Sequence, residues 1–318
     1  MWYFCFFHEH EALKDFENLG RNLTMKNFLV SLITAALVLG AGVANAQVSF
    51  CGYSVSNTND TYEGKDRGAS ASGYTALCYD TPIGVVEIKH GFQLYHQQAV
   101  HRYHPVFIPQ DRPYAGVMNL TAAIHREYAG MQVRLAFGVD VVGPQTGVSL
   151  GQIWIHKIFK LREPDPYNVS QQVGNAFYLV AQAEVGRVFE FGSLEVRPFI
   201  EGRIGIEDYF RGGFDIAVFG GFPDAVSRDF VTGNTYGFSP EADYEPTWHL
   251  IVGADVTHRF NSGLYEGSLV PFNPTTLRGR VQMGYGNFSI NATYLSADFI
   301  SPRSYDQWTF GIVYSKSF

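Results

Sequence analysis

Several segments of the chain alternate between apolar and polar side chains, and this period-two pattern constrains the fold more than any other feature. One face of residues 306–318 carries Trp308, Phe310, Ile312, Tyr314 and Phe318, and the other face is mostly small or polar. Residues 130–142, 193–206, 247–260 and 275–286 repeat the pattern, with Arg, Gln, Glu or Asp opposite Val, Leu or Ile. Side chains of a strand point alternately to its two faces, so the pattern predicts strands with one apolar and one polar face.

The polar faces combine arginine and glutamate with many glycines, and the apolar faces end in aromatic residues. A soluble sandwich also alternates, but strands in a bilayer must pair every backbone polar group and therefore close into a barrel. The pattern predicts an all-β protein, a closed antiparallel transmembrane β-barrel of about 12 strands. We expect the strands near 49–57, 73–80, 83–97, 114–127, 130–142, 175–189, 193–206, 210–219, 247–260, 275–286, 287–299 and 306–318. The long gaps at 98–113, 143–174 and 220–246 are the expected extracellular loops.

Charged residues of both signs fall on the polar faces of the predicted strands. They are Glu184, Arg197, Glu201, Arg203, Asp255, Arg278 and Arg280. Opposed charges on neighbouring strands are expected to fill a narrow barrel with ion pairs, which disfavours a general porin. The net charge of -7 argues against a nucleic-acid partner, because nucleic-acid-binding proteins usually present a basic surface.

The N-terminal part of the sequence has the pattern of an export signal. A lysine and an apolar run follow Met25, and the run ends in a small-x-small sequence at Ala46. We expect synthesis to start at Met25 and cleavage to follow Ala46, so that residues 1–46 are an upstream extension plus a signal peptide. A genuine N-terminal extension is the alternative. The barrel is then residues 47–318, with two cysteines, Cys51 and Cys78, that either pair in an oxidising compartment or remain two buried thiols.

One stretch between strands, "VSLGQIWIHKIFK" at residues 148–160, does not alternate and predicts a short loop helix near 148–159. Gln152 and His156 are four residues apart and therefore share one face of such a helix. The histidine is either a packed loop residue or a member of a catalytic site.

Oxygen-bearing side chains follow the first strand at Asn59 and Asp60, and Thr75 lies on the next predicted strand. Carboxylate and amide oxygens suit a hard cation such as calcium, whereas an ordinary turn at a strand end has the same composition. The segment "PQDRPYAG" at 109–116 by itself predicts a rigid turn before a strand.

These segments together resemble a known family. "NDTYEGKDRGASASGYTA", "FIPQDRPYAGVMNLTAA" and "VGPQTGVSLGQIWIHKIF" are similar, in this order, to the hallmark segments of the LpxR-type outer-membrane lipid A 3′-O-deacylases. The resemblance covers essentially the whole chain after the signal segment. One departure is that the family's Tyr-Thr-x-Gly reads "YTAL" here, with Leu77 in place of glycine.

The resemblance implies a calcium-dependent esterase of the outer membrane that removes the 3′-linked acyloxyacyl chain of lipid A. It implies that His156 is the general base, that Gln152 orients it or the substrate, and that Asn59 and Thr75 belong to the active site. Asp60 is the first candidate for the Ca²⁺ ligand, Asn59 beside it is the second, and Glu163 is a weaker one.

The expected partners are lipopolysaccharide as substrate and the membrane itself, and the protein is expected to be a monomer. The competing hypothesis is an outer-membrane barrel without chemistry, either a small channel or a structural protein. The enzyme hypothesis requires that His156 and Asp60 lie at the same end of the barrel, and the competing hypothesis does not.

Overall fold

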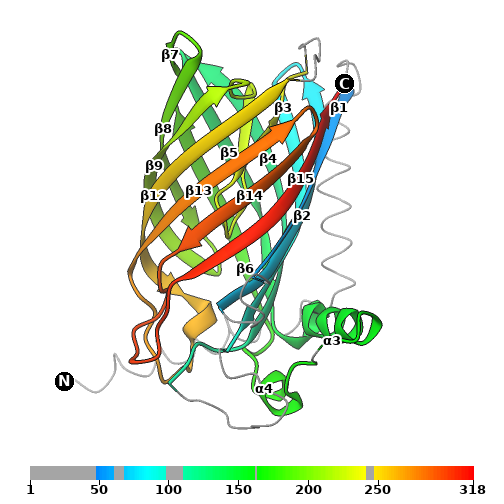
Figure 1. Cartoon of the computed structure of the whole chain (residues 1–318), viewed down its shortest axis with the longest axis vertical. Coiled ribbons are helices and arrows are strands. Elements are labelled where there is room, and N and C mark those ends of the chain that lie inside the picture. Colours follow the sequence, from blue (N-terminus) through cyan, green and yellow to red (C-terminus); the bar gives the residue numbers. More distant parts are fainter. Residues whose placement is uncertain (1–47, 61–67, 98–109, 162, 241–246) are drawn as a thin grey trace, which may run out of the picture. The chain divides into compact units, whose positions relative to one another are not determined.

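The computed structural model describes residues 48–60, 68–97, 110–161, 163–240 and 247–318, and the predicted signal segment lies outside them. Residues Ser49–Phe318 form one compact unit, a ring of antiparallel strands (Figure 1). The strands are β1 (Ser49–Asn59), β2 (Gly68–Thr81), β3 (Gly84–His96), β4 (Ala115–Tyr128), β5 (Met131–Val142), β6 (Ala176–Gly186), β7 (Phe189–Phe191), β8 (Leu194–Ile204), β9 (Glu207–Phe219), β10 (Ala225–Arg228), β11 (Thr235–Phe238), β12 (Trp248–Ser262), β13 (Thr275–Tyr285), β14 (Phe288–Leu295) and β15 (Gln307–Ser317). The helices are η2 (Pro144–Thr146), α3 (Val148–Ile158), α4 (Pro166–Ser170) and η3 (Gly263–Tyr265).

Twelve strands close the ring, which confirms the predicted barrel. Pairing runs from β6 through β5, β4, β3, β2 and β1 to β15, and then through β14, β13, β12 and β9 to β8. β8 pairs with β6, and this contact closes the cylinder. The short β7 follows β6 in the chain and pairs with the beginning of β8, so it continues the pairing between β6 and β8. β2 starts at Gly68, earlier than the predicted residue 73, and this difference matters for the site.

The barrel is apolar outside and charged inside. Phe137, Leu179 and Ile204 point outward with 67%, 85% and 64% of their surface exposed, whereas Glu184 and Arg197 are buried in the interior. This is the inverse of a water-soluble domain and is typical of a barrel whose outer surface contacts lipid. None of the described helices is both long and apolar enough to cross a bilayer.

The two rims of the barrel differ. β1 begins and β15 ends at one rim, called here the terminal rim, where the turns at residues 82–83, 129–130 and 286–287 are short (Figure 1). The opposite rim carries α3 and α4 and is called the α3 rim. Outer-membrane barrels have short periplasmic turns and longer extracellular loops, so we expect the α3 rim to face outward from the cell.

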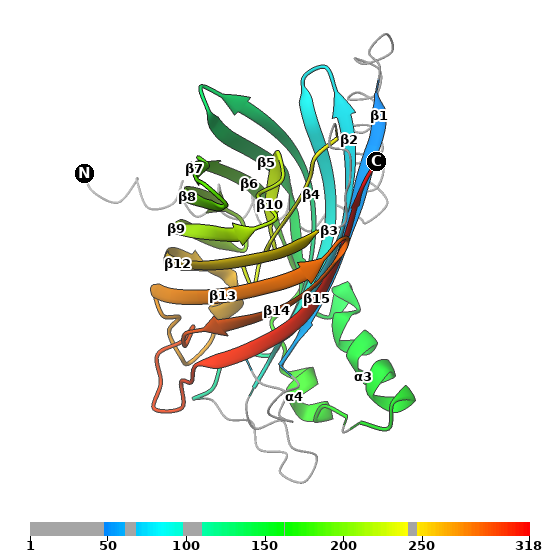
Figure 2. The ribbon, with the colours of Figure 1, turned by 45° about the horizontal axis from the view of Figure 1, so that its top comes forward.

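The prediction of an extracellular loop at 220–246 was wrong. β9 ends and β12 begins at the terminal rim, and the described part of their connection returns into the barrel as the β10–β11 hairpin (Figure 2). All four residues of β10 are buried, so its sequence lacks the alternation of a strand with one exposed and one buried face. The predicted loop at 143–174 connects β5 to β6 at the α3 rim, whereas most of the predicted loop at 98–113 lies outside the described residues.

The hairpin fills the interior through ion pairs with the barrel wall. Arg228 of β10 lies 3.1 Å from Glu184 and 2.6 Å from Asp215. Each of these carboxylates also contacts an arginine of the wall, Glu184 with Arg197 at 2.8 Å and Asp215 with Arg280 at 2.6 Å. The prediction of an interior filled by opposed charges is therefore confirmed, with the inserted hairpin as an additional contributor.

A disulfide joins Cys51 to Cys78, with their Cα atoms 5.1 Å apart. The register between β1 and β2 shifts between Phe50 and Gly52, and such a bulge adds one residue to β1. Cys51 is thereby buried, directly beside Gly52, whose partner in β2 is Cys78. Of the two alternatives left open by the sequence, pairing is the one found.

Candidate functional site at the α3 rim

α3 leaves the barrel wall through two glycines. β5 ends at Val142, and Gly143 and Gly147 then adopt φ angles of 96° and 69°. Backbone with positive φ favours glycine, because a Cβ atom there meets the backbone. The turn between them, started by Pro144, places α3 against β3 and β4 at the rim.

The two faces of α3 are reversed relative to a helix on a soluble protein. Ser149 and Gln152 are 3% and 7% exposed, and His156 is half-buried one turn after Gln152. The apolar residues point away from the barrel with 47–66% of their surface exposed: Leu150, Trp154, Ile155 and Ile158. A helix in water normally buries its apolar stripe, so this one presents its polar side chains to the barrel and its apolar side chains to the surroundings.

Gln152 connects the helix to the rim. Its Oε1 atom accepts a hydrogen bond from the Tyr114 hydroxyl at 2.9 Å and lies 2.7 Å from Nε2 of His96. An amide oxygen only accepts, so Nε2 of His96 carries the proton in this pair. His96 ends β3 and Tyr114 immediately precedes β4, and their rings pack edge to face with centroids 4.8 Å apart. The helix face that carries His156 is therefore fixed against the barrel.

Asn59 and Asp60 lie at the end of β1. The backbone N–H of Asp60 donates to the carbonyl of Ser70 at 3.1 Å, and the Ser70 hydroxyl donates to Oδ1 of Asp60 at 3.4 Å. Oδ1 of Asn59 is buried and has no hydrogen-bond partner among the residues that the structure describes. Ser70 was not predicted as a site residue, because its place opposite Asp60 depends on the register of β1 with β2.

Strand direction brings these groups to one rim. β1, β3 and β5 all pair antiparallel with their neighbours and so end at the same rim, where α3 follows β5. β1 is two strands from β3, or about 10 Å along the rim at the usual strand spacing. The structure therefore places His156, Gln152, Asn59 and Asp60 at the same end of the barrel.

Thr75 lies elsewhere. It pairs with Val55 and His90 in the middle of the sheet, and its side chain is exposed on the outward face. Five residues of strand separate Thr75 from Ser70, or about 17 Å at the usual rise. The structure does not bring Thr75 to the other predicted site residues, and Ser70 is the hydroxyl residue beside Asp60.

The oxygen atoms of Asn59 and Asp60 are the part of the site that fits a hard cation. Carboxylate and amide oxygens are ligands that calcium accepts, and the buried amide oxygen of Asn59 has an unused lone pair. Glu163 follows α3, is partly exposed, and lies 3.9 Å from Lys157. Within the described ranges no three His, Cys, Asp or Glu side chains form a cluster able to hold a metal.

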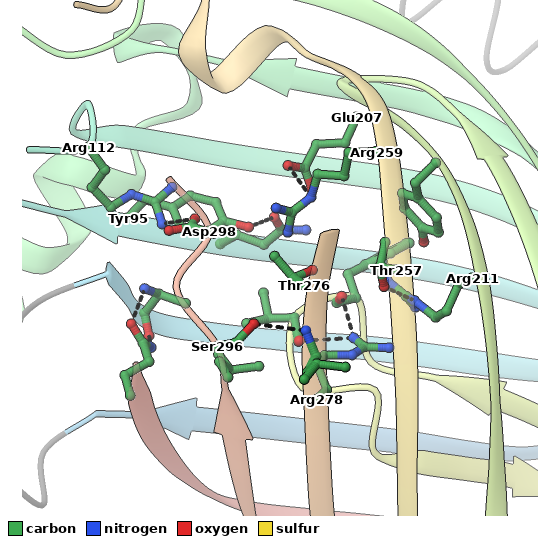
Figure 3. Close-up of a pocket in the computed structure, with 18 of the residues that line it drawn as sticks. Tyr95, Arg112, Glu207, Arg211, Thr257, Arg259, Thr276, Arg278, Ser296 and Asp298 are labelled. Atoms are coloured by element: carbon green, nitrogen blue, oxygen red, sulfur yellow. Dashed lines mark hydrogen bonds and ion pairs between the residues drawn. The ribbon is translucent and has the colours of Figure 1, made fainter. Parts of the chain in front are cut away.

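A cavity of about 80 Å³ lies inside the barrel at the same rim (Figure 3). Phe230 and Val231 at the tip of the β10–β11 hairpin are among its lining residues, and Arg112 and Asp298 lie side by side in Figure 3. Arg112 belongs to the Asp-Arg-Pro-Tyr-Ala-Gly segment, and its ion pair is with Asp298 at 2.6 Å. Burial lowers the pKa of Arg112, but Asp298 together with the neighbouring tyrosines outweighs burial, and the pKa lies above its ordinary value. The guanidinium is therefore charged.

Comparison with known proteins gives one family and one fold. The family model described as "Outer membrane protein LpxR" matches residues 88–300. The solved structure of LpxR from Salmonella typhimurium has a TM-score of 0.65 at 16% identity, covering 83% of this chain and 99% of that one. A KdgM porin covers 83% of this chain and 99% of its own at 6% identity, with a TM-score of only 0.36. Omp33 of Acinetobacter baumannii covers 85% and 99% at 10% identity, with a TM-score of 0.38. A search of curated proteins finds no match.

Proposed function

Because this chain belongs to the LpxR family of outer-membrane proteins, we propose that it is an esterase acting on lipid A. The reaction is hydrolysis of the ester that holds the 3′-linked acyloxyacyl chain. The substrate is a lipopolysaccharide molecule in the outer leaflet, next to α3.

The reversed faces of α3 are the observation that carries this proposal. Helices that lie in a membrane interface bury an apolar face among acyl chains. α3 directs Trp154 and Ile158 outward, level with the rim of a barrel whose own outer wall is apolar, and holds Gln152 and His156 on the barrel side. A lipid whose ester enters between α3 and the barrel wall meets the polar side chains of Gln152 and His156.

The residues on the barrel side have complementary roles in this reaction. The imidazole of His156 takes a proton from a water molecule at neutral pH, and that water attacks the ester carbonyl. The proton then passes to the alkoxide oxygen of the departing sugar, so that a fatty acid and a sugar hydroxyl are the products. Gln152 is a positioning residue, because its bonds to Tyr114 and His96 fix the turn of α3 on which His156 stands.

Asn59 and Asp60 are the residues that would hold a calcium ion, with Ser70 supporting the Asp60 carboxylate. When bound there, calcium supplies positive charge to the carbonyl oxygen of the ester. Glu163 is a less favourable ligand, because Lys157 lies within ion-pair distance of its carboxylate.

A channel function is disfavoured by the filled interior. The β10–β11 hairpin occupies the lumen, and its Arg228 binds two carboxylates of the wall, Glu184 of β6 and Asp215 of β9. A conducting barrel of this size needs a continuous water-filled path, which the hairpin interrupts.

The test is mass spectrometry of lipid A from cells that produce the wild-type protein or the variant His156→Asn. We expect the wild type to convert lipid A to a species that lacks the 3′-linked chains, and the variant to lose at least about 100-fold of this activity, as expected for a removed general base. His258→Asn is the matched control, because His258 is an exposed histidine that bonds only Thr275 among the described residues. A chelator added to the wild type tests the metal separately. Unchanged lipid A in wild-type cells, with the protein folded in the outer membrane, contradicts the proposal.

A further inference from the structure

The side chain of Arg112 is buried with part of its hydrogen-bonding capacity unused. It is 1% exposed, Nη1 donates to Oδ2 of Asp298 at 2.6 Å, and its guanidinium stacks 4.0 Å from the centre of the Tyr95 ring. Its Nε and Nη2 atoms are buried and have no hydrogen-bond partner among the described residues. A buried charged donor without an acceptor is destabilising, so these two atoms point to a missing acceptor.

The two unused donors have a specific geometry. Nε and Nη2 lie on the same edge of the planar guanidinium, and the opposite side of the group already serves Asp298. Two parallel N–H donors on one edge match two oxygens of a carboxylate or a phosphate. A sugar hydroxyl satisfies only one of them at a time, so the edge favours an oxyanion.

The cavity beside Arg112 has space and further donors for such a group. Five arginines line it, Arg112, Arg203, Arg211, Arg259 and Arg278, against two carboxylates, Glu207 and Asp298. Buried carboxylates of the barrel interior that do not line the cavity pair with three of these arginines, as Asp140 does with Arg203 at 2.5 Å. Nε of Arg203 nevertheless remains buried without a partner in the described part of the chain. The cavity therefore presents guanidinium donors in excess of acceptors.

The same short stretches of chain connect the cavity to α3. Tyr95 stacks on Arg112, and the next residue, His96, contacts Gln152 of α3. Two residues after Arg112, Tyr114 donates to the same glutamine. Tyr95 also pairs with Ala115 across β3 and β4. The cavity and the polar face of α3 thus lie on the two sides of one section of the rim.

We propose that the cavity binds an oxyanion, a phosphate or a carboxylate, on the carbohydrate headgroup of the lipopolysaccharide molecule whose ester lies at α3. The identity of this ligand rests on the proposed function. At the barrel rim, a single amphiphile can place its acyl chains against the outer wall and its headgroup over the lumen. Arg112 is then a binding residue for the headgroup, and it does not take part in the hydrolysis.

The experiment measures binding without requiring catalysis. The probe is the water-soluble phosphorylated oligosaccharide that remains after all acyl chains are removed from lipopolysaccharide, titrated into the detergent-solubilised barrel by calorimetry. We expect binding by the wild type and an affinity at least about tenfold lower for Arg112→Gln, as for the loss of a charged hydrogen-bonding pair. Dephosphorylated and carboxyl-reduced forms of the probe identify the source of the oxyanion, since only the form that lacks the bound group loses affinity.

Two further variants separate binding from folding. Asp298→Asn removes a negative charge beside Arg112 and leaves the Nε and Nη2 donors in place, so we expect it to bind the anionic probe several-fold more tightly than the wild type. Arg197→Gln removes an equally buried arginine that pairs with Glu184 and does not line the cavity, so we expect no change. Absence of wild-type binding, equal binding of all three probe forms, or an equal loss in Arg197→Gln overturns the proposal. Binding with unaltered lipid A in cells leaves this site standing and refutes the deacylase.

Discussion

The anchoring of the internal hairpin gives the prediction with the best-defined magnitude. Arg228 of the β10–β11 hairpin forms ion pairs with Glu184 and Asp215, and its guanidinium lies 3.5 Å from the centre of the Phe199 ring. The substitution Arg228→Met keeps an unbranched side chain against Phe199 and removes both ion pairs. We expect the hairpin to leave its docked position far more often.

The size of the effect follows from the remaining partners. Removing one member of a buried ion pair destabilises a protein by about 3–5 kcal/mol. Glu184 keeps Arg197 and Asp215 keeps Arg280, so neither carboxylate becomes unpaired and the lower end applies. A loss of about 3 kcal/mol in docking free energy raises the undocked population roughly 140-fold, because each 1.4 kcal/mol is a factor of ten.

Hydrogen exchange measures this population directly in the folded barrel. The bond from the Asp229 N–H to the Asn234 carbonyl, 2.9 Å long, closes the hairpin, and its amide should exchange faster in Arg228→Met by about the same factor. Arg126→Met is the matched control, because Arg126 is exposed at the end of β4 and such substitutions change stability by about 0.5 kcal/mol or less. If the hairpin amides of the Arg228 variant exchange as slowly as those of the control, ion pairs do not hold the hairpin.

Three other substitutions test separate features. Tyr114→Phe removes a donor to Gln152, worth about 1 kcal/mol, so the amides of α3 should exchange roughly fivefold faster, and unchanged exchange contradicts the anchoring role of this bond. Trp154→Glu places a charge on the apolar face of α3, at a cost of about 1 kcal/mol near a membrane interface; lipid A conversion should fall roughly fivefold by mass spectrometry, whereas Trp154→Phe should retain it. Replacing Cys51 and Cys78 together by serine opens a link between residues 27 apart and should cost about 3 kcal/mol, seen as a lower melting temperature that reductant no longer changes.

The wall of the barrel could be predicted from sequence because each wall strand faces two contrasting environments. Phe310 points to the outer surface and Thr309 to the charged interior, so the two neighbours differ in polarity. This alternation along the sequence is what predicts the strand. β10 has no such contrast. Val226 and Ser227 are both buried, and the partners that fix the strand, such as Glu87 for Ser227, come from distant parts of the chain.

The site was predictable where it depends on a single helix and less so where it depends on register. Gln152 and His156 share a face because helix geometry alone fixes residues four apart. The residue opposite Asp60 depends on where β2 begins, and a shift of five residues replaces Thr75 by Ser70 and moves the threonine to the lipid side. The role of Arg112 was not visible either, since its partner Asp298 lies 186 positions later in the chain.

The rim from which the hairpin enters also determines how the protein can be built. The hairpin connects β9 to β12 at the terminal rim, where both ends of the barrel chain lie. Its charged residues therefore reach the lumen without crossing the hydrocarbon layer. The cylinder can therefore close in the membrane first and take up its filling afterwards. A protein that loses this filling should still be exported, inserted and counted among the outer-membrane proteins of the cell, while making that cell permeable to small antibiotics and dyes.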